Sequence, residues 1–170
     1  MKKIIVLLLT MLSVISVRAQ MIAAHTDLAL WALQTYNLGA EMTINNRSTL
    51  CLDGAYVNKP YGQKDFKIYS AQPELRYYFG GRPMYHHFVG ISGIAAKYQI
   101  TWKDDYHSGT AFGAGLTFGY VFPITRDLTI DAHTGVGIVG YNDSKNHTDN
   151  KLGYMLVPTK IGITLSYIIR

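Results

Sequence analysis

Long stretches of strict two-residue alternation are the feature that most limits what this 170-residue chain can fold into. In 112–122, aliphatic and aromatic residues such as Phe112, Leu116 and Phe118 occupy one face, and the other face carries mainly glycine. Successive side chains of a β-strand point to opposite faces, so this period predicts a strand. The same alternation recurs in 128–140 and 153–169. These runs exceed the ~5–6 residues of a typical globular strand and match the ~9–11 residues of a tilted strand that crosses a membrane.

The lengths of the connections predict the topology. Further strands are expected at 37–45, 49–57, 66–79 and 86–102. Short connections alternate with longer polar ones along the chain, namely 45–48, 80–85 and 123–127 against 58–65, 103–108 and 142–152. Outer-membrane barrels alternate short periplasmic turns with longer outer loops, so an even strand number is required. Parity places one more strand at 23–33, where 28–33 is also compatible with a short helix. The prediction is an eight-stranded antiparallel up-and-down transmembrane β-barrel, with both ends on the periplasmic side.

The charges separate a membrane barrel from its alternative, a soluble exported barrel of the lipocalin kind. A soluble barrel places its apolar face inward, whereas here the apolar face is nearly free of charge and the opposite face combines glycines with ionisable groups. The residues expected to form a structural polar network inside are Glu41, Asp53, Glu74, Arg76, Asp131, His133 and Lys160. The apolar face is then expected to contact lipid. Aromatic residues near the short turns are expected to form a girdle at the membrane surface, namely Tyr77, Tyr78, Phe79, Tyr85, Tyr120 and Phe122.

The first nineteen residues have the pattern of a secretory signal peptide, with a charged start, an apolar centre and a small-residue end. Cleavage is expected between Ala19 and Gln20, which leaves 20–170 as one domain in the outer membrane. Removing Lys2, Lys3 and Arg18 leaves 13 Lys+Arg against 11 Asp+Glu, a net charge of +2. A balance this close to neutral, without a basic cluster, argues against nucleic-acid binding. The single cysteine, Cys51, excludes a disulfide framework and is expected to pack as a small strand residue.

No catalytic, cofactor-binding or metal-binding residue is expected from these patterns, and the chain is predicted not to be an enzyme. The main alternative is a lipid-modifying outer-membrane enzyme of the lipid A acyl hydrolase or transferase type. Asp131 and His133 share a strand face, but the pattern places no serine beside them. A pore is disfavoured because the interior of an eight-stranded barrel is only wide enough to be filled by side chains. The glycine-rich run 135–140 matches a dinucleotide-binding pattern, but no helix follows it, so inward-facing glycines are expected instead.

The predicted function is therefore a non-enzymatic barrel, expected as a monomer, with a structural role or a role in binding through its loops. Its partners would be outer-membrane lipid and an extracellular ligand held by 58–65, 103–108 and 142–152. The side chains proposed for such contacts are Tyr61, Tyr106 and His107.

Several segments resemble those of a known family. They are 37–41, 72–79, 87–90, 112–120 and 158–160, and the most specific of them reads Gln-Pro-Glu-Leu-Arg-Tyr from Gln72. They resemble a bacteroidete family catalogued only as a domain of unknown function and thought to form OmpA- or OmpX-like outer-membrane barrels. The resemblance implies eight strands and no established activity. The chain departs from such barrels at its end, where Tyr167 is followed by Ile-Ile-Arg170 instead of a terminal aromatic residue.

Overall fold

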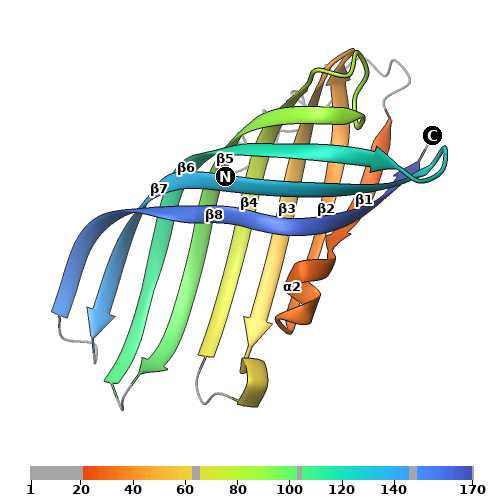
Figure 1. Ribbon diagram of the computed structural model, residues 1–170. Helices are drawn as coiled ribbons and strands as arrows, with labels where there is room; N and C mark the ends of the chain where they lie inside the picture. The colour runs from red at the N-terminus through yellow and green to blue at the C-terminus, as the bar shows by residue number, and fades with distance from the viewer. Residues whose placement is uncertain (1–20, 63–65, 103–104, 146–148, 170) are drawn as a thin grey trace, which may run out of the picture.

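The computed structural model describes residues 21–62, 66–102, 105–145 and 149–169, which are almost entirely β-strand. Eight antiparallel strands pair in chain order, and β1 also pairs with β8, so the sheet closes into a ring (Figure 1). The strands are β1 (Ile22–Asp27), β2 (Thr35–Asn45), β3 (Ser48–Asn58), β4 (Phe66–Tyr78), β5 (His86–Trp102), β6 (Asp105–Pro123), β7 (Leu128–Lys145) and β8 (Asp149–Ile169). The predicted all-β class and the eight antiparallel strands are confirmed. Within the described residues, no helix combines the length and the apolar character needed to cross a membrane.

The ring has two unlike ends, as Figure 1 shows. One end, called the turn end below, carries the connections β2–β3, β4–β5 and β6–β7 together with Met21 and Ile169. The opposite loop end carries the helix α2 (Leu28–Ala32) and the 3-10 turn η1 (Pro60–Gly62). The order of the strands and of their connections is as predicted, but the lengths of the connections do not alternate. The loop-end connections 103–104 and 146–148 are shorter than the turn-end connection 79–85. The predicted signal peptide and its cleavage site lie outside the described residues.

The two faces of the sheet divide as the alternation predicts. Large apolar side chains point outward and are exposed, for example Leu38 (71%), Ile91 (65%) and Ile161 (73%). The inward face carries buried polar groups and glycine. Gly113 and Gly137 allow neighbouring strands to approach closely, because a Cβ at either position would meet a backbone carbonyl of the adjacent strand. The predicted inward position of the 135–140 glycines is confirmed for Gly135 and Gly137, which are buried.

The segment 23–33 is half strand and half helix, so the expected full-length strand there is wrong. β1 ends at Asp27, whose carboxylate accepts hydrogen bonds from the backbone N–H groups of Ala29 (2.8 Å) and Leu30 (3.2 Å). This N-cap satisfies donors that a strand would have paired with its neighbour, and so the helix α2 begins. Trp31 in α2 fastens the turn to β1 through a hydrogen bond from its indole nitrogen to the Thr26 hydroxyl (2.7 Å).

The early end of β1 leaves the ring wall uneven. β8 pairs with β1 over 164–169, and β2 pairs with β1 over 39–42. Nearer the loop end, α2 packs against both β8 and β2 in place of a strand. The Asn37 side chain continues the pairing beyond the ladder, since its amide accepts from the Asp27 N–H (2.6 Å) and donates to the Asp27 carbonyl (2.9 Å).

Two predicted loops are shorter than expected. Residues 105–108 belong to β6, where Tyr106 and His107 pair with Thr101 and Ile100 of β5. Residues 142–145 and 149–152 belong to β7 and β8, which remain in register as far as the pair Lys145–Asp149. Strand pairing uses backbone groups, so it continues through polar residues that the sequence pattern assigns to loops.

A bulge in β8 changes which of its residues point inward. Gly135 pairs with Lys160 and Val136 pairs with Pro158, so Thr159 has no partner on β7. Thr159 and Lys160 both point inward as a result, and Thr159 approaches Gly115 and Gly135. The expected single alternation across 153–169 is therefore wrong before the bulge, where Met155 and Val157 join the interior wall. One extra residue reverses every face on one side of it.

Apolar side chains close the turn end of the interior. Ala23, Met84 and Ile168 form one buried cluster, and Tyr78, Phe88 and Val121 form another. Tyr78 is fully buried, so its predicted place in the outer girdle is wrong. It is an even-numbered residue on β4, like Glu74 and Arg76, and shares their inward face. Other expected girdle residues do gather outside, with Tyr77 against Phe79 and Tyr120 against Phe122.

Candidate functional site

Arg76 on β4 lies at the centre of the interior, between the two apolar clusters and the loop end. Its guanidinium nitrogens lie 3.1 Å from Glu41 Oε2, 3.2 Å from Glu74 Oε2 and 3.5 Å from Asp131 Oδ2. Its carbon Cζ stacks over the Phe88 ring at 4.5 Å. One arginine therefore holds carboxylates from β2, β4 and β7, which ties strands on different sides of the ring together.

Lys160 and His133 extend this network. The Lys160 ammonium donates to Asp53 Oδ2 (2.6 Å) and to Glu74 Oε2 (2.9 Å). His133 Nδ1 lies 2.7 Å from Asp131 Oδ1, and its Nε2 lies 3.5 Å from Asp27 Oδ2. All seven residues expected inside meet in this single cluster.

Several members of the cluster were missed by sequence reasoning. His25 on β1 is 5% exposed, and its Nε2 lies 2.6 Å from Asp53 Oδ1. Cys51 on β3 is fully buried, with its Sγ 3.7 Å from His25 Nε2. The sequence does indicate an inward position for Cys51, because Cys51 is two residues from Asp53 and so shares its strand face. His25 carried a weaker signal, since the segment that contains it was compatible with either a strand or a helix.

Neutral hydroxyl groups complete the site around Glu41. Thr49 Oγ1 donates to Glu41 Oε1 at 2.5 Å, and the Tyr78 hydroxyl donates to the same oxygen at 2.6 Å. With Arg76 on the other oxygen, both sides of this buried carboxylate are bound. These contacts fix the orientation of the carboxylate.

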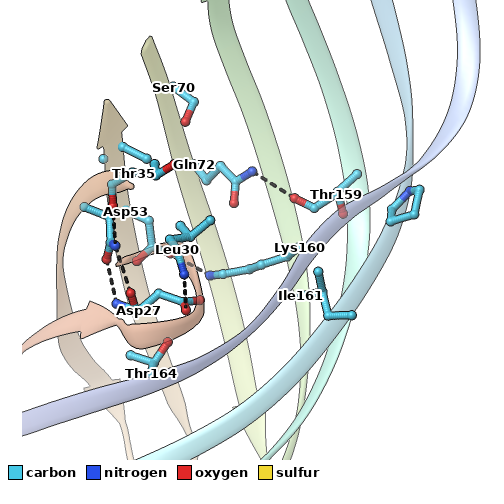
Figure 2. A pocket seen from close by; sticks show the side chains of 14 residues that line it. Asp27, Leu30, Thr35, Asp53, Ser70, Gln72, Thr159, Lys160, Ile161 and Thr164 are labelled. Carbon is cyan, nitrogen blue, oxygen red and sulfur yellow. Dashed lines mark hydrogen bonds and ion pairs between the residues drawn. The ribbon is translucent and has the colours of Figure 1, made fainter. Parts of the chain in front are cut away.

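A cavity of about 260 Å³ lies on the loop-end side of the cluster, beside α2 (Figure 2). Its polar floor includes Asp27, Asp53 and Lys160. Figure 2 also shows the Gln72 amide reaching across the interior to the Thr159 carbonyl (3.1 Å), which links β4 to the bulge of β8. Leu30 of α2 forms part of the wall. The cavity thus lies where the helix replaces a strand.

The interior wall nearer the loop end is apolar. A second hollow is lined from β4 through β8 by Ile68, Ala96, Tyr98, Ile100, Ala111, Val139, Tyr141, Met155 and Val157. The interior therefore has three layers along its length, with an apolar plug at the turn end, the charged cluster in the middle and an apolar wall beyond it.

Neither buried histidine forms a nucleophile–base–acid relay. In such a relay one imidazole nitrogen faces the nucleophile and the other faces the acid. His25 faces Cys51 and Asp53 through the same nitrogen, Nε2. His133 directs both ring nitrogens at carboxylates. The geometry therefore provides charge pairing and donor atoms for a ligand, and it lacks an activated nucleophile at these two positions.

The three residues proposed for loop contacts differ in their exposure and lie on different elements. Tyr61 in η1 is 67% exposed, but its hydroxyl donates to the Ala32 carbonyl (2.7 Å) and its N–H to the Gln34 side chain (2.8 Å). Tyr61 thus joins η1 to the end of α2. Tyr106 and His107 are half-buried residues of β6.

Residues 4–169 match the family described as "Protein of unknown function (DUF3575)". The chain belongs to this family. The expected membership in a family of uncharacterised function is therefore confirmed. No curated protein and no solved structure matches the chain.

Proposed function

We propose that this DUF3575 protein is a β-barrel of the outer membrane that crosses the bilayer with its eight strands. The observation that carries the proposal is the inverted arrangement of the ring, in which charge is buried and apolar side chains are exposed. Leu38, Phe112 and Ile138 are 60–71% exposed, while Arg76 and Glu74 are each 1% exposed. Soluble proteins rarely expose continuous apolar surface of this kind, and lipid-facing strands require it.

Two further features support the location and orientation. The N-terminal pattern favours export, and the aromatic contacts Tyr77–Phe79 and Tyr120–Phe122 lie at the turn end, where a membrane-surface girdle is expected. We place both described ends on the periplasmic side, so the loop end would face the exterior.

The proposed role is structural or based on binding at the loop end, without catalysis and without conduction. The Arg76 cluster and the buried pair Tyr78 and Phe88 fill the middle and the turn end of the interior. Filling of this kind is expected of an eight-stranded barrel, whose interior holds side chains rather than a water channel.

A matched pair of substitutions tests membrane embedding. Ile138 lies mid-strand on β7 with 60% exposure, and Ile124 lies in the β6–β7 turn with 53% exposure. In a bilayer, Ile138→Lys is expected to cost about 2–4 kcal/mol of unfolding free energy, because lysine then faces hydrocarbon. Ile124→Lys is expected to have little effect. Unfolding would be followed in lipid vesicles by the shift between folded and heat-unfolded bands on a denaturing gel. Equal, small effects, together with recovery of the wild type in the soluble periplasmic fraction, would refute the proposal.

A second candidate function is lipid binding, and the interrupted wall between β8 and β2 favours it. The apolar wall that includes Val139 and Met155 lies on the loop-end side of the charged cluster, and the 260 Å³ cavity lies beside α2. An acyl chain that entered beside the helix would meet an apolar wall. This candidate function is binding without catalysis, because the two buried histidines do not have the geometry of a nucleophile–base–acid relay.

Lipid extracted from the purified protein would test this second candidate. Val139→Trp fills the apolar hollow and should reduce the amount of lipid that is retained through purification. Val136→Trp, on the outer face of the same strand, should leave it unchanged. Retention that is the same in both variants would remove lipid binding as a candidate.

A further inference from the structure

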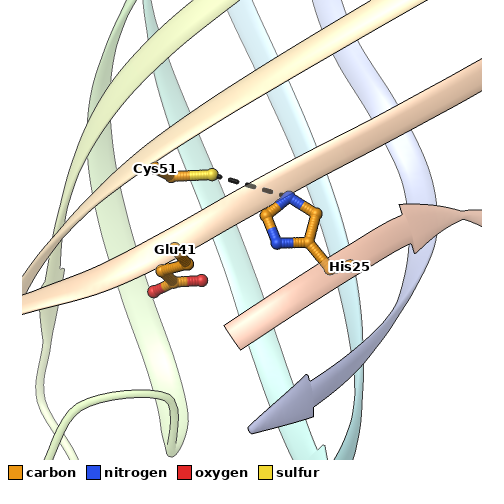
Figure 3. Close-up of side chains that lie close together, drawn as sticks. All are labelled: His25, Glu41 and Cys51. Atoms are coloured by element: carbon orange, nitrogen blue, oxygen red, sulfur yellow. Dashed lines mark hydrogen bonds between the residues drawn. The ribbon is translucent and has the colours of Figure 1, made fainter. Parts of the chain in front are cut away.

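Cys51 is surrounded by side chains that can bind a metal ion. Its Sγ lies 3.7 Å from His25 Nε2 and 3.5 Å from Asp53 Oδ2. Donor atoms of His25, Glu41 and Cys51 all lie within 4.8 Å of one another, as do those of Cys51, Asp53 and Glu74. Figure 3 shows His25 and Cys51 approaching each other from β1 and β3, with Glu41 of β2 beside them. One thiol therefore belongs to two overlapping sets of nitrogen and oxygen donors.

The spacing of these donors matches tetrahedral zinc. Zinc lies about 2.0–2.3 Å from nitrogen, oxygen and sulfur ligands, which places the ligand atoms of a tetrahedron about 3.3–3.6 Å apart. The distances from Cys51 to His25 and Asp53, 3.7 Å and 3.5 Å, already fall near this range. The His25–Asp53 separation is 2.6 Å and would have to open slightly as zinc replaces the shared proton.

The strand between these ligands carries a glycine at the point where they meet. Gly39 of β2 lies between β1 and β3, where it pairs with His25 on one side and Asp53 on the other. A Cβ at Gly39 would overlap the His25 ring and the Asp53 carboxylate. The missing side chain is therefore what allows residues from two non-adjacent strands to meet.

The excess of carboxylates around the site also favours binding of a cation. The carboxylates of the interior cluster are Asp27, Glu41, Asp53, Glu74 and Asp131. The cations that face them are Arg76 and Lys160, and the two histidines are His25 and His133. Five carboxylates face two permanent cations, which leaves an excess of negative charge in the interior. An uncompensated charge that is buried away from water is energetically costly. A divalent ion would compensate it and would also stabilise Cys51 as a thiolate.

An entry route exists for the ion. The Asp53 side chain is 23% exposed and lines the 260 Å³ cavity, as Figure 2 shows. An ion in this cavity can reach Asp53, whose carboxylate oxygens lie 2.6 Å from His25 Nε2 and 3.5 Å from Cys51 Sγ.

We propose that His25, Cys51 and Asp53 bind Zn²⁺. The ion ties β1 to β3 across Gly39 and so secures the shortest strand of the ring, which has only six residues. Its role is structural, and binding contributes directly to the stability of the closed ring.

Cobalt and zinc titration of the full-length protein, folded in detergent and freed of metal with a chelator, tests the proposal. Co²⁺ is expected to bind at one ion per chain and to give a sulfur-to-cobalt absorption band, which Zn²⁺ then displaces. Cys51→Ser should abolish the band, and His25→Gln should weaken binding at least tenfold. His87→Gln removes an exposed histidine that packs against Tyr120 away from the site, and it should leave the affinity unchanged.

A second measurement needs no substitution. Zn²⁺ at micromolar concentration should raise the urea midpoint of unfolding of the wild type, whereas Mg²⁺ should not, because thiolate and imidazole ligands favour zinc. Lys160→Met should tighten binding, since Lys160 competes for Asp53 Oδ2. A wild type that shows neither the cobalt band nor a zinc-dependent midpoint would overturn the proposal, as would a band that persists in Cys51→Ser.

Discussion

Replacing Arg76 by methionine should destabilise the protein strongly, and the structure indicates which carboxylate is responsible. Methionine keeps most of the volume and removes the charge. Glu74 retains Lys160 at 2.9 Å, and Asp131 retains His133 at 2.7 Å. Glu41 retains only the neutral donors Thr49 and Tyr78. Arg76→Met therefore leaves Glu41 as the one of these three carboxylates that keeps neither a lysine nor a histidine partner.

Loss of one partner of a buried ion pair costs about 3–5 kcal/mol. A domain with about 5–15 kcal/mol of total stability should then show a clearly lower midpoint of unfolding. The assay is urea unfolding in lipid vesicles, followed by tryptophan fluorescence and by the heat-dependent gel shift. Arg47→Met is the matched control, because Arg47 is exposed in the β2–β3 turn and its guanidinium donates to the neutral Tyr77 hydroxyl (3.2 Å). It should leave the midpoint unchanged.

Two double substitutions identify the unpaired charge. Glu41→Gln in the Arg76→Met background should restore most of the lost stability, since an amide can still accept from Thr49 and Tyr78. Glu74→Gln in the same background should restore little, because it removes a carboxylate that Lys160 already compensates. Equal rescue by both, or equal midpoints for Arg76→Met and Arg47→Met, would refute this account of the interior.

Two further predictions concern orientation and strand packing. In a Cys51→Ser background, Asn58→Cys at the loop end should react with a membrane-impermeant thiol reagent on intact cells. Asn46→Cys in the β2–β3 turn should react only after lysis. The reverse pattern would mean that the loop end faces the periplasm. Gly113→Ala should cost about 1–3 kcal/mol of unfolding free energy, because the new Cβ would lie 2.5 Å from the Ile138 carbonyl, while Gly54→Ala has 3.7 Å to its nearest neighbour and should be tolerated. Urea midpoints compare the two glycine variants, and equal values would contradict the packing argument.

The alternation in the sequence predicts the interior cluster well, because a regular strand fixes which side chains face inward. Glu41, Asp131 and Lys160 lie far apart in the chain, and period two alone places them inside the ring. Their partners were not predictable in the same way, since pairing across the interior depends on strand register and on the tilt of eight strands.

Two features are not decided by the alternation, for a local reason, although the sequence is compatible with a short helix at 28–33. The bulge at Thr159 turns two consecutive residues inward, and only the neighbouring Pro158 hints at it, since proline tends to occur in sheets at edges and bulges. The strand-to-helix change at Asp27 depends on a side-chain cap. Both are decided by single residues, whereas the alternation signal is an average over many.

These two exceptions lie on either side of the same part of the wall. The cap at Asp27 ends β1 early, and the bulge turns Thr159 and Lys160 of β8 toward the space that α2 borders. An ordinary ladder satisfies backbone groups with a neighbouring strand, and a wall that faces lipid needs that pairing most. Here Asn37 substitutes for part of the ladder, and the proposed zinc site would anchor the short strand from inside. The irregular segment is therefore where the ring departs from uniform strand pairing. The 260 Å³ cavity lies there, lined by Leu30 of α2 and by the proposed zinc ligand Asp53.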